Sequence, residues 1–368
     1  MQYQRIQKIL QDRPLPIEIS RNLKADTENY SHNCENIIGS LQVPVGVAGL
    51  LQINNKSYVL PIATTEAVLV ASINRGCKVI AEAGGAKSMV QKIGITRAPV
   101  YKLSKSRDLI YYKNWFKDNT KKLQELASQK SRFTKILKIT PVKYKGLLYV
   151  KFYFDTADAM GMNMATIACE KMNELICPEL KAECIAISSN FCSDKKPSLV
   201  NIKLGRGYKA SASIRIPSQI IENTLKTTLK KIKQSYTAKI VNGSKLAKSI
   251  CMNSHQANIV AGIFLATGQD VAHIGESSLG KTVLKFQPEY IDFRVEIPSI
   301  VCGTVGGGTK LPTQDEAIKL IGLGESIKPG DQALEFASVI AGAVLAGEIS
   351  LLASISQGTL ALAHENAR

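Results

Sequence analysis

Residues 134–164 read TKILKITPVKYKGLLYVKFYFDTADAMGMNM, and this stretch decides the fold. It holds two strand-like runs rich in β-branched and aromatic residues, followed by the start of a helical pattern. A helical pattern precedes the stretch, and another strand-like run follows it. In chain order these segments are Lys113–Ser128 (helix), Thr134–Tyr144 and Leu147–Phe154 (strands), Met160–Ile176 (helix) and Ala182–Ser188 (strand). Preceded by one more strand, this order is typical of a ferredoxin-like fold.

The residues around this stretch are unusually basic. Lysine and arginine recur between residues 87 and 151, whereas the acids there are Asp108, Asp118 and Glu125. A change in composition of this kind marks a separate unit, so we expect an inserted domain over residues 99–187. A chain of 368 residues suits about two domains. We therefore expect an α+β fold in which residues 31–98 and 188–368 form a large mixed domain around a long buried central helix, after a helical segment at 1–30.

The flanking segments also carry recognisable patterns. Short apolar runs separated by turns predict strands and loops over residues 35–62, and strands continue from Asn201 to about Pro217. A helix is expected from Thr64, with Thr64 or Thr65 as its cap, to Gly84–Gly85, with apolar residues on most faces. Further helices are expected at about 217–234, 245–267, 313–323, 330–346 and 349–365.

The charge and the cysteines limit the class of protein. A net charge of +17 fits plain solubility, a nucleic-acid partner, or a small polyanionic ligand such as CoA or NADPH. Eight scattered cysteines without a CxxC pair, and only four histidines, predict neither a zinc site nor a disulfide framework, and favour the cytosol. No signal peptide is expected at the start. No membrane span is expected either, because Gly347 and Glu348 break the apolar run after Phe336, and Ile259–Thr267 is too short.

Four residues are candidates for chemistry, each with a simpler alternative. Glu66, in the first turn of its expected helix, either complements the helix dipole or donates a proton. Lys195, in NFCSDKKPS (190–198), either lies in an exposed turn or directs an ammonium at a carbonyl oxygen. Asp270 would sit at a helix C-terminus, where the dipole disfavours it, on a similar side to His255 and Asn258. His364 is either part of a frayed tail or a mobile acid.

Two glycine-containing segments are weaker candidates. DAMGMNM (158–164) opens a helix after a strand, and Gly161 would let the backbone approach a pyrophosphate, although no GxGxxG pattern is present. The alternative is a methionine-rich buried helix start. Gly306, Gly307 and Gly308 are either a ligand loop or a flexible turn.

Seven segments together resemble class I 3-hydroxy-3-methylglutaryl-CoA (HMG-CoA) reductases, in order from about residue 35 to the end. They are ENIIGSLQVPVGVAG (35–49), TTEAVLVASINRGCKVI (64–80), DAMGMNM (158–164), NFCSDKKPS (190–198), ANIVAGIFLATGQD (257–270), GTVGGGTKLP (303–312) and LALAHENAR (360–368).

The resemblance implies roles for individual residues. Glu66, Lys195 and Asp270 would be the coupled catalytic charges, and His364 would protonate the departing CoA thiolate. The hydroxymethylglutaryl group would be held by Arg97, Ser188, Asp194, Lys196, Lys239, His255 and Asn258. CoA would meet Arg75, Glu35 and Asn36. NADPH would be selected by Ser131, Arg132 and Phe133, and its nicotinamide half approached by Asp158, Met160, Gly161, Met162, Asn163 and the Gly306–Gly308 loop.

The resemblance also implies the reaction and the assembly. HMG-CoA would be reduced to mevalonate and CoA with two NADPH, through a mevaldyl-CoA hemithioacetal and mevaldehyde. The inserted basic domain would bind the cofactor, and active sites would form between the protomers of at least a homodimer. No metal, nucleic acid or membrane partner is implied. The alternatives are an NADH-preferring degradative reductase, a basic nucleic-acid-binding protein and a catalytically dead CoA-binding relative.

The chain departs from the family pattern in a few places. SICMNSH (249–255) is one residue shorter than the usual glycine-rich run, Lys245 and Lys248 replace small residues, and Ser189 stands where glycine is common. These changes bear on the acyl pocket and leave the four catalytic residue types in place. The serine that follows the terminal histidine in animal enzymes, and their membrane anchor, are not expected here.

Overall fold

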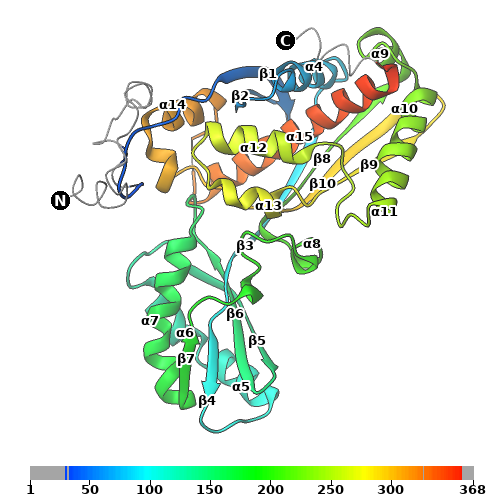
Figure 1. Ribbon diagram of the computed structural model, residues 1–368. Helices are drawn as coiled ribbons and strands as arrows, with labels where there is room; N and C mark the ends of the chain where they lie inside the picture. The colour runs from blue at the N-terminus through cyan, green and yellow to red at the C-terminus, as the bar shows by residue number, and fades with distance from the viewer. Residues whose placement is uncertain (1–29, 31–32, 326, 359–368) are drawn as a thin grey trace, which may run out of the picture.

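The computed structural model describes residue 30 and residues 33–325 and 327–358. Figure 1 shows a broad upper body that contains α4, α12 and α15 and a smaller lower unit that contains α5–α7 and β4–β7, with strand β3 running between them. The segment expected at 1–30 lies outside the described residues except for Tyr30. The strands are β1 (Val45–Ile53), β2 (Lys56–Ala63), β3 (Lys87–Arg97), β4 (Val100–Leu103), β5 (Lys135–Tyr144), β6 (Leu147–Asp155), β7 (Ala182–Ala186), β8 (Arg206–Pro217), β9 (Lys281–Phe286) and β10 (Tyr290–Ile300).

The α-helices carry the labels of Figure 1. They are α4 (Leu69–Glu82), α5 (Leu109–Asp118), α6 (Thr120–Ser128), α7 (Met162–Leu180), α8 (Leu199–Leu204), α9 (Ser218–Asn223), α10 (Leu229–Ser235), α11 (Ser244–Leu246), α12 (Gln256–Ala266), α13 (Ile274–Ser277), α14 (Pro312–Ile321) and α15 (Asp331–Gln357). Short 3₁₀ helices are η1 (Asn190–Cys192), η3 (Val271–His273) and η4 (Gly307–Lys310), and η2 (Tyr236–Gly243) is a π-helix.

Helix α15 is the centre of the upper body. It runs for 27 residues and is buried along nearly all of Ala333–Ala353. Small residues let its neighbours approach closely, since a Cβ on Gly76 of α4 would lie 1.9 Å from the carbonyl oxygen of Ala346. By length and composition α15 could span a membrane, but 94% of its most apolar window is buried inside the protein. Such burial is typical of a core helix, which agrees with the central helix that we expected.

One sheet connects the two parts of the molecule. Its strand order is β7-β4-β6-β3-β8-β10-β9, and β5 pairs with the free side of β6. Strand β3 belongs to both parts, because residues 87–94 pair with β8 whereas residues 95–97 pair with β6. Each part has a hydrophobic core of its own, one around α15 and one between α7 and β6. Because β3 belongs to both parts, the sheet fixes the position of the lower unit relative to the upper body.

The lower unit is built from a strand, two short helices, two strands, a long helix and a strand. Strand β4 pairs antiparallel with β6 on one side and with β7 on the other, and β5 pairs antiparallel with β6. The order across this part of the sheet is therefore β7-β4-β6-β5. The predicted strands at 134–144 and 147–154 and the helix from about Met160 are confirmed within a few residues.

Two helix predictions in the upper body were wrong at their starts. Helix α4 begins at Leu69, because the Thr64 hydroxyl accepts the Glu66 N–H at 2.9 Å and Val68 is left-handed (φ 64°), which keeps this segment in a turn. One side of α4 is also exposed, although we expected burial on most faces.

The helix expected at 245–267 is confined to Gln256–Ala266. Met252 instead forms a bridge with Lys281, and the Met252 N–H donates to the Gly280 carbonyl at 3.1 Å. Met252 therefore pairs with the edge of β9, and the backbone around it does not continue a helix.

The bounds of three other helices differ from the expected ones, because polar residues there have contacts that the local sequence does not reveal. The two helices expected at 330–346 and 349–365 are one continuous α15 through Gly347 and Glu348, because Glu348 is buried and hydrogen-bonded rather than exposed. The helix expected at 217–234 is split by the Thr228 cap of α10, and that expected at 113–128 is split at Asn119.

Candidate functional site

Lys195 and Asp270 form the ion pair at the centre of the site. Lys195 Nζ lies 2.6 Å from Asp270 Oδ2, and both side chains are partly exposed, at 40% and 33%. Lys195 has a left-handed backbone (φ 56°), and its N–H donates to the buried Glu276 carboxylate at 3.1 Å. The loop is therefore held by its backbone, while the ammonium group remains accessible.

Asp270 is positioned differently from our expectation. It caps the N-terminus of η3, where its Oδ1 accepts the Ala272 N–H at 3.0 Å, so the helix dipole favours its charge instead of opposing it. Burial raises the pKa of its carboxyl, but hydrogen bonds from Lys195 and Ala272, with the charges of His273 and Lys195, outweigh burial and leave the pKa lower than usual. Asp270 is therefore an anion at neutral pH.

Glu66 lies in the exposed turn before α4, three residues ahead of its first residue, so its predicted place in the first helical turn was wrong. Its Oε2 accepts a hydrogen bond from Asn258 Nδ2 at 2.8 Å. This contact joins a predicted catalytic residue to a predicted substrate residue. Among the described residues, the ion pairs found do not include one between Glu66 and Lys195.

His255 begins α12 as its N-cap residue. Its backbone N–H donates to the buried Glu348 carboxylate at 2.8 Å, and its Nε2 is buried with no hydrogen-bond partner in the described part of the chain. Lys239 is exposed in the π-helix η2. π-helices are rare and often occur at functional sites, which fits the predicted role of Lys239.

The predicted acyl-binding residues of the Lys195 loop lie close together. Arg97 Nη1 donates to Ser188 Oγ at 2.6 Å and lies 3.7 Å from Asp194 Oδ2. Lys196 Nζ donates to the carbonyl oxygen of Asp194 at 3.2 Å. The structure thus brings the end of β3 and residues 188–196 into one polar surface.

A buried polar cluster, consisting of Arg206, His273 and Glu276, lies beneath this loop and was missed from the sequence. All three residues are fully buried. Arg206 Nη1 and His273 Nδ1 lie 2.5 and 2.6 Å from Glu276 Oε1. Burial alone would raise the pKa of Glu276, but His273 and Arg206 outweigh it and lower the pKa. No sequence pattern marks these residues, because an arginine beginning a strand ordinarily faces solvent.

The same cluster has the geometry of a metal site but the wrong charge for one. Ligand atoms of Asp194, His273 and Glu276 lie within 4.8 Å of one another. The guanidinium of Arg206 already contacts both carboxylates, at 3.1 Å from Asp194 Oδ1 and 2.5 Å from Glu276 Oε1. A cation there would face a resident positive charge, so this cluster does not favour a metal ion.

The two glycine-containing segments lie side by side. Ala159 bridges to Val305, and the Thr304 N–H donates to the carbonyl oxygen of Asp158 at 2.8 Å. A Cβ on Gly308 would lie 2.5 Å from the Gly268 carbonyl, next to Asp270. The Asp158 carboxylate itself accepts hydrogen bonds from the Gly330 and Ala333 N–H groups at the start of α15.

Helix α7 has an open N-terminus in the same region. Gly161 is left-handed (φ 87°), no side chain caps the helix, and a Cβ on Gly161 would lie 2.3 Å from Thr156. Met162 Sδ is 2.7 Å from Arg206 Nη2, which ties this helix to the buried cluster, and Asn163 is exposed.

The remaining predicted residues are spread over three places. Ser131, Arg132 and Phe133 form the loop before β5, with the Arg132 guanidinium 4.9 Å from the centre of the Phe133 ring. Arg75 donates to Ser350 Oγ at 3.0 Å and to the Ser350 carbonyl at 2.6 Å, so its guanidinium meets α15. Glu35 and Asn36 are exposed ahead of β1, and His364 lies outside the described residues.

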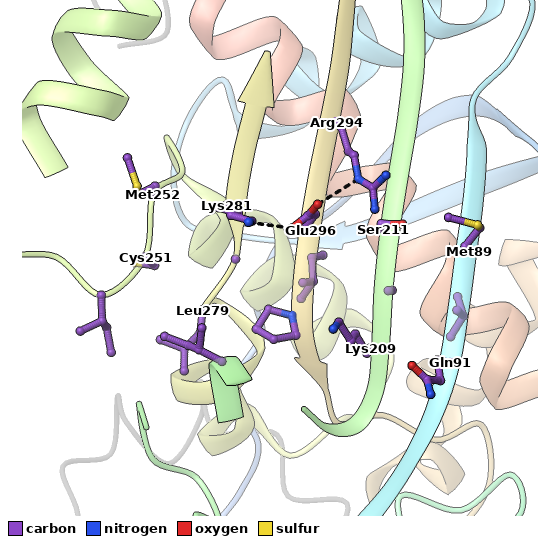
Figure 2. Close-up of a pocket in the computed structure, with 17 residues that line it drawn as sticks. Met89, Gln91, Lys209, Ser211, Cys251, Met252, Leu279, Lys281, Arg294 and Glu296 are labelled. Atoms are coloured by element: carbon purple, nitrogen blue, oxygen red, sulfur yellow. Dashed lines mark ion pairs between the residues drawn. The ribbon is translucent and has the colours of Figure 1, made fainter. Parts of the chain in front are cut away.

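A separate pocket of about 520 Å³ opens on the outer face of the sheet formed by β3, β8, β9 and β10, as Figure 2 shows. Lys281 and Arg294 flank Glu296 across its floor, at 3.0 and 3.1 Å. None of the predicted site residues lines it. We therefore do not assign the chemistry to this pocket.

Comparisons with known proteins identify the family of this chain. The chain matches the hydroxymethylglutaryl-coenzyme A reductase family over residues 3–368. A 3-hydroxy-3-methylglutaryl-coenzyme A reductase of Methanothermobacter thermautotrophicus is 42% identical over 354 residues, which is 95% of this chain and 88% of that protein. The reductase of the same name from Pyrococcus abyssi is 44% identical over 348 residues, 92% of this chain and 85% of that protein.

Solved structures give the same answer for the fold. The NADPH-bound class II 3-hydroxy-3-methylglutaryl-CoA reductase of Streptococcus pneumoniae superposes with a TM-score of 0.72, covers 96% of both chains and is 20% identical. At that identity the likeness shows the mixed helix-and-sheet fold alone. The family match over nearly the whole length, together with the archaeal relatives, carries the assignment: the chain belongs to the hydroxymethylglutaryl-coenzyme A reductase family.

Proposed function

We propose that this protein reduces HMG-CoA to mevalonate and CoA with two NADPH, as a class I enzyme of the mevalonate pathway. The observation that carries the proposal is the 2.6 Å ion pair of Lys195 and Asp270, which presents an anchored, accessible ammonium group in a chain of this family. The proposal of class I rests on the seven sequence segments quoted above, and the class II structure is only 20% identical to this chain. The balanced reaction takes up two hydrides and two protons and releases one thiol.

The residues of this chain divide the work. Lys195 stabilises the negative charge that grows on the carbonyl oxygen when hydride reaches the thioester carbon. Collapse of the hemithioacetal breaks the C–S bond, and His364 gives a proton to the departing thiolate. The aldehyde then accepts a second hydride, and Glu66, held by Asn258 at 2.8 Å, supplies the proton to its oxygen.

The fold of the lower unit is an argument that it binds NADPH. Its strand order β7-β4-β6-β5 is that of a ferredoxin-like fold, which fits an inserted cofactor domain at 99–187 within a substrate domain at 31–98 and 188–368. The cofactor supplies hydride. The open N-terminus of α7 beside Gly161 suits its pyrophosphate, and the exposed guanidinium of Arg132 suits a 2′-phosphate.

A homodimer with its active sites between protomers accounts for an exposed apolar surface. Between residues 38 and 50 the structure exposes several large apolar side chains: Ile38, Leu41, Val45, Val47 and Leu50. Contiguous exposed apolar residues mark interaction sites. The free cysteines support a reducing compartment, the cytoplasm.

The test of the function is a count of products. NADPH oxidation is followed by absorbance with and without HMG-CoA, and released CoA is titrated as free thiol. We expect two NADPH oxidised per CoA released, and no oxidation without HMG-CoA. A protein that binds DNA or RNA tightly in a salt-sensitive way and oxidises no NADPH would instead support the nucleic-acid alternative.

Arg132→Ala tests the cofactor preference. We expect KM for NADPH to rise about 10- to 100-fold while kcat changes little, because the lost guanidinium contacts the 2′-phosphate equally before and during hydride transfer. Steady-state kinetics with NADPH and NADH measure this, and Lys130→Ala, an exposed cation two residues away, is the control. An unchanged NADPH-to-NADH preference would contradict the assignment and favour the degradative alternative.

His364→Gln tests the proton donor to CoA. We expect the variant to reduce free mevaldehyde far better than the thioester, because only the thioester releases a thiolate that can add back. The two substrates are compared at equal enzyme concentration. Equal loss on both would show that His364 does something other than protonate the thiolate.

A further inference from the structure

His273 lies between two carboxylates beneath the catalytic pair. It is fully buried, its Nδ1 is 2.6 Å from Glu276 Oε1, and its Nε2 is 3.8 Å from Asp270 Oδ2. That same Oδ2 accepts the Lys195 ammonium at 2.6 Å. Nε2 has no hydrogen-bond partner in the described part of the chain. A buried polar atom without a partner is costly, and here it is directed at the carboxylate that holds Lys195.

The neighbours of the ring define which way it donates. An ionised carboxylate only accepts hydrogen bonds, so the ring can bond to Asp270 only by donating from Nε2. The charged groups that face it are Asp270 on η3, Glu276 on α13, Asp194 and Lys195 on the loop, and Arg206 on β8, with Arg97 of β3 against Asp194.

The geometry of Asp270 leaves room for an exchange of partners. A hydrogen bond needs about 2.7–3.2 Å, so Nε2 reaches Oδ2 after a shift of about 1 Å or less. When negative charge builds on the substrate oxygen, the Lys195 ammonium is drawn toward it and Asp270 loses part of its compensation. A hydrogen bond from His273 Nε2 to Asp270 Oδ2 would compensate the carboxylate for the departing ammonium group.

Resting on the function proposed above, we propose that His273 is a positioning residue that takes over the Asp270 carboxylate when Lys195 turns to the substrate oxyanion. It touches neither substrate nor cofactor, because it is fully buried. The bond from Nδ1 to Glu276 keeps the ring in place while Nε2 closes on Oδ2. Glu276 in turn holds the backbone of Lys195, so one buried pair serves both members of the catalytic ion pair.

Two variants separate this role from a packing role. His273→Phe fills the volume without a donor, and His273→Gln keeps a neutral donor. We expect kcat of the Phe variant to fall about 10- to 100-fold, the value of a hydrogen bond to a charged group, with KM for HMG-CoA changed less than about threefold. The Gln variant should recover part of kcat. Thr267→Val is the control: Thr267 is buried, its hydroxyl donates to the Ile263 carbonyl of α12, and kcat should stay within about twofold.

The pH dependence of kcat separates the two roles, because a loss of packing alone would not change it. The neighbouring charge of His273 helps to keep the pKa of Asp270 low, so removing His273 should raise the pKa of Asp270. The acid limb of the plot of kcat against pH should then move to higher pH in both variants. Carbon-13 NMR of the Asp270 carboxyl, assigned with Asp270→Asn, follows the same change without any turnover.

The outcomes are distinguishable. If the wild type shows no HMG-CoA-dependent NADPH oxidation, the proposed function fails, and the NMR titration still decides whether His273 acts on Asp270. An active wild type whose Phe variant keeps kcat within twofold, or whose Asp270 titration does not move, overturns the inference alone. If the Phe variant does not fold, the same two measurements on the Gln variant decide.

Discussion

Lys195→Ala should lower kcat for HMG-CoA about 100- to 1000-fold, while the protein stays folded. In the proposed mechanism the ammonium supplies the charge opposite the developing oxyanion, and a single lost donor of this kind costs about 10²–10³-fold. Stability should barely change, because the side chain is 40% exposed and partly exposed ion pairs contribute little. NADPH absorbance measures kcat, and thermal melting measures folding.

Lys203→Ala is the matched control, since Lys203 is an exposed lysine on α8, a few residues along the chain. It should leave kcat and KM unchanged. A Lys195→Ala variant that keeps more than a tenth of wild-type activity would remove Lys195 from the chemistry.

Arg206→Met should destabilise the protein strongly. Arg206 is fully buried and contacts two carboxylates, Glu276 at 2.5 Å and Asp194 at 3.1 Å. Removing it leaves both without their main cation, and breaking a buried pair costs about 3–5 kcal/mol. Urea unfolding followed by circular dichroism measures the free energy of unfolding.

Arg215→Met on the same strand provides the comparison. Arg215 pairs with Asp292 at 2.8 Å, but on the exposed face of the sheet, so the unfolding midpoint should barely move. If the two substitutions lowered the free energy of unfolding equally, the buried cluster beneath the Lys195 loop would not be a main source of stability.

Local pattern predicted the lower unit well. Its strands alternate or run apolar over lengths that suit a sheet, and the order of segments leaves few topologies. The pairing of Lys195 with Asp270 was predicted from the resemblance, and the structure places the two residues together although 75 positions separate them in the chain. The residue roles themselves stay predictions.

The failures share a physical cause. Helix α4 starts late because the Thr64 hydroxyl bonds to a nearby N–H, and α15 continues through Glu348 because three backbone or hydroxyl donors from distant segments meet it. The buried cluster of Arg206, His273 and Glu276 was invisible for the same reason. Charged residues are normally exposed, and only tertiary contacts supply the partners that let them be buried.

The central claim, that an N–H-donating cation at position 195 supports the charge on the substrate oxygen, is tested most directly by chemical rescue. Lys195→Ala is assayed with added methylammonium or, at equal concentration, tetramethylammonium, which carries the same charge but donates no hydrogen bond. We predict that activity returns in proportion to methylammonium and not to tetramethylammonium. Equal rescue by both ions, or full activity of the variant without either, would contradict it.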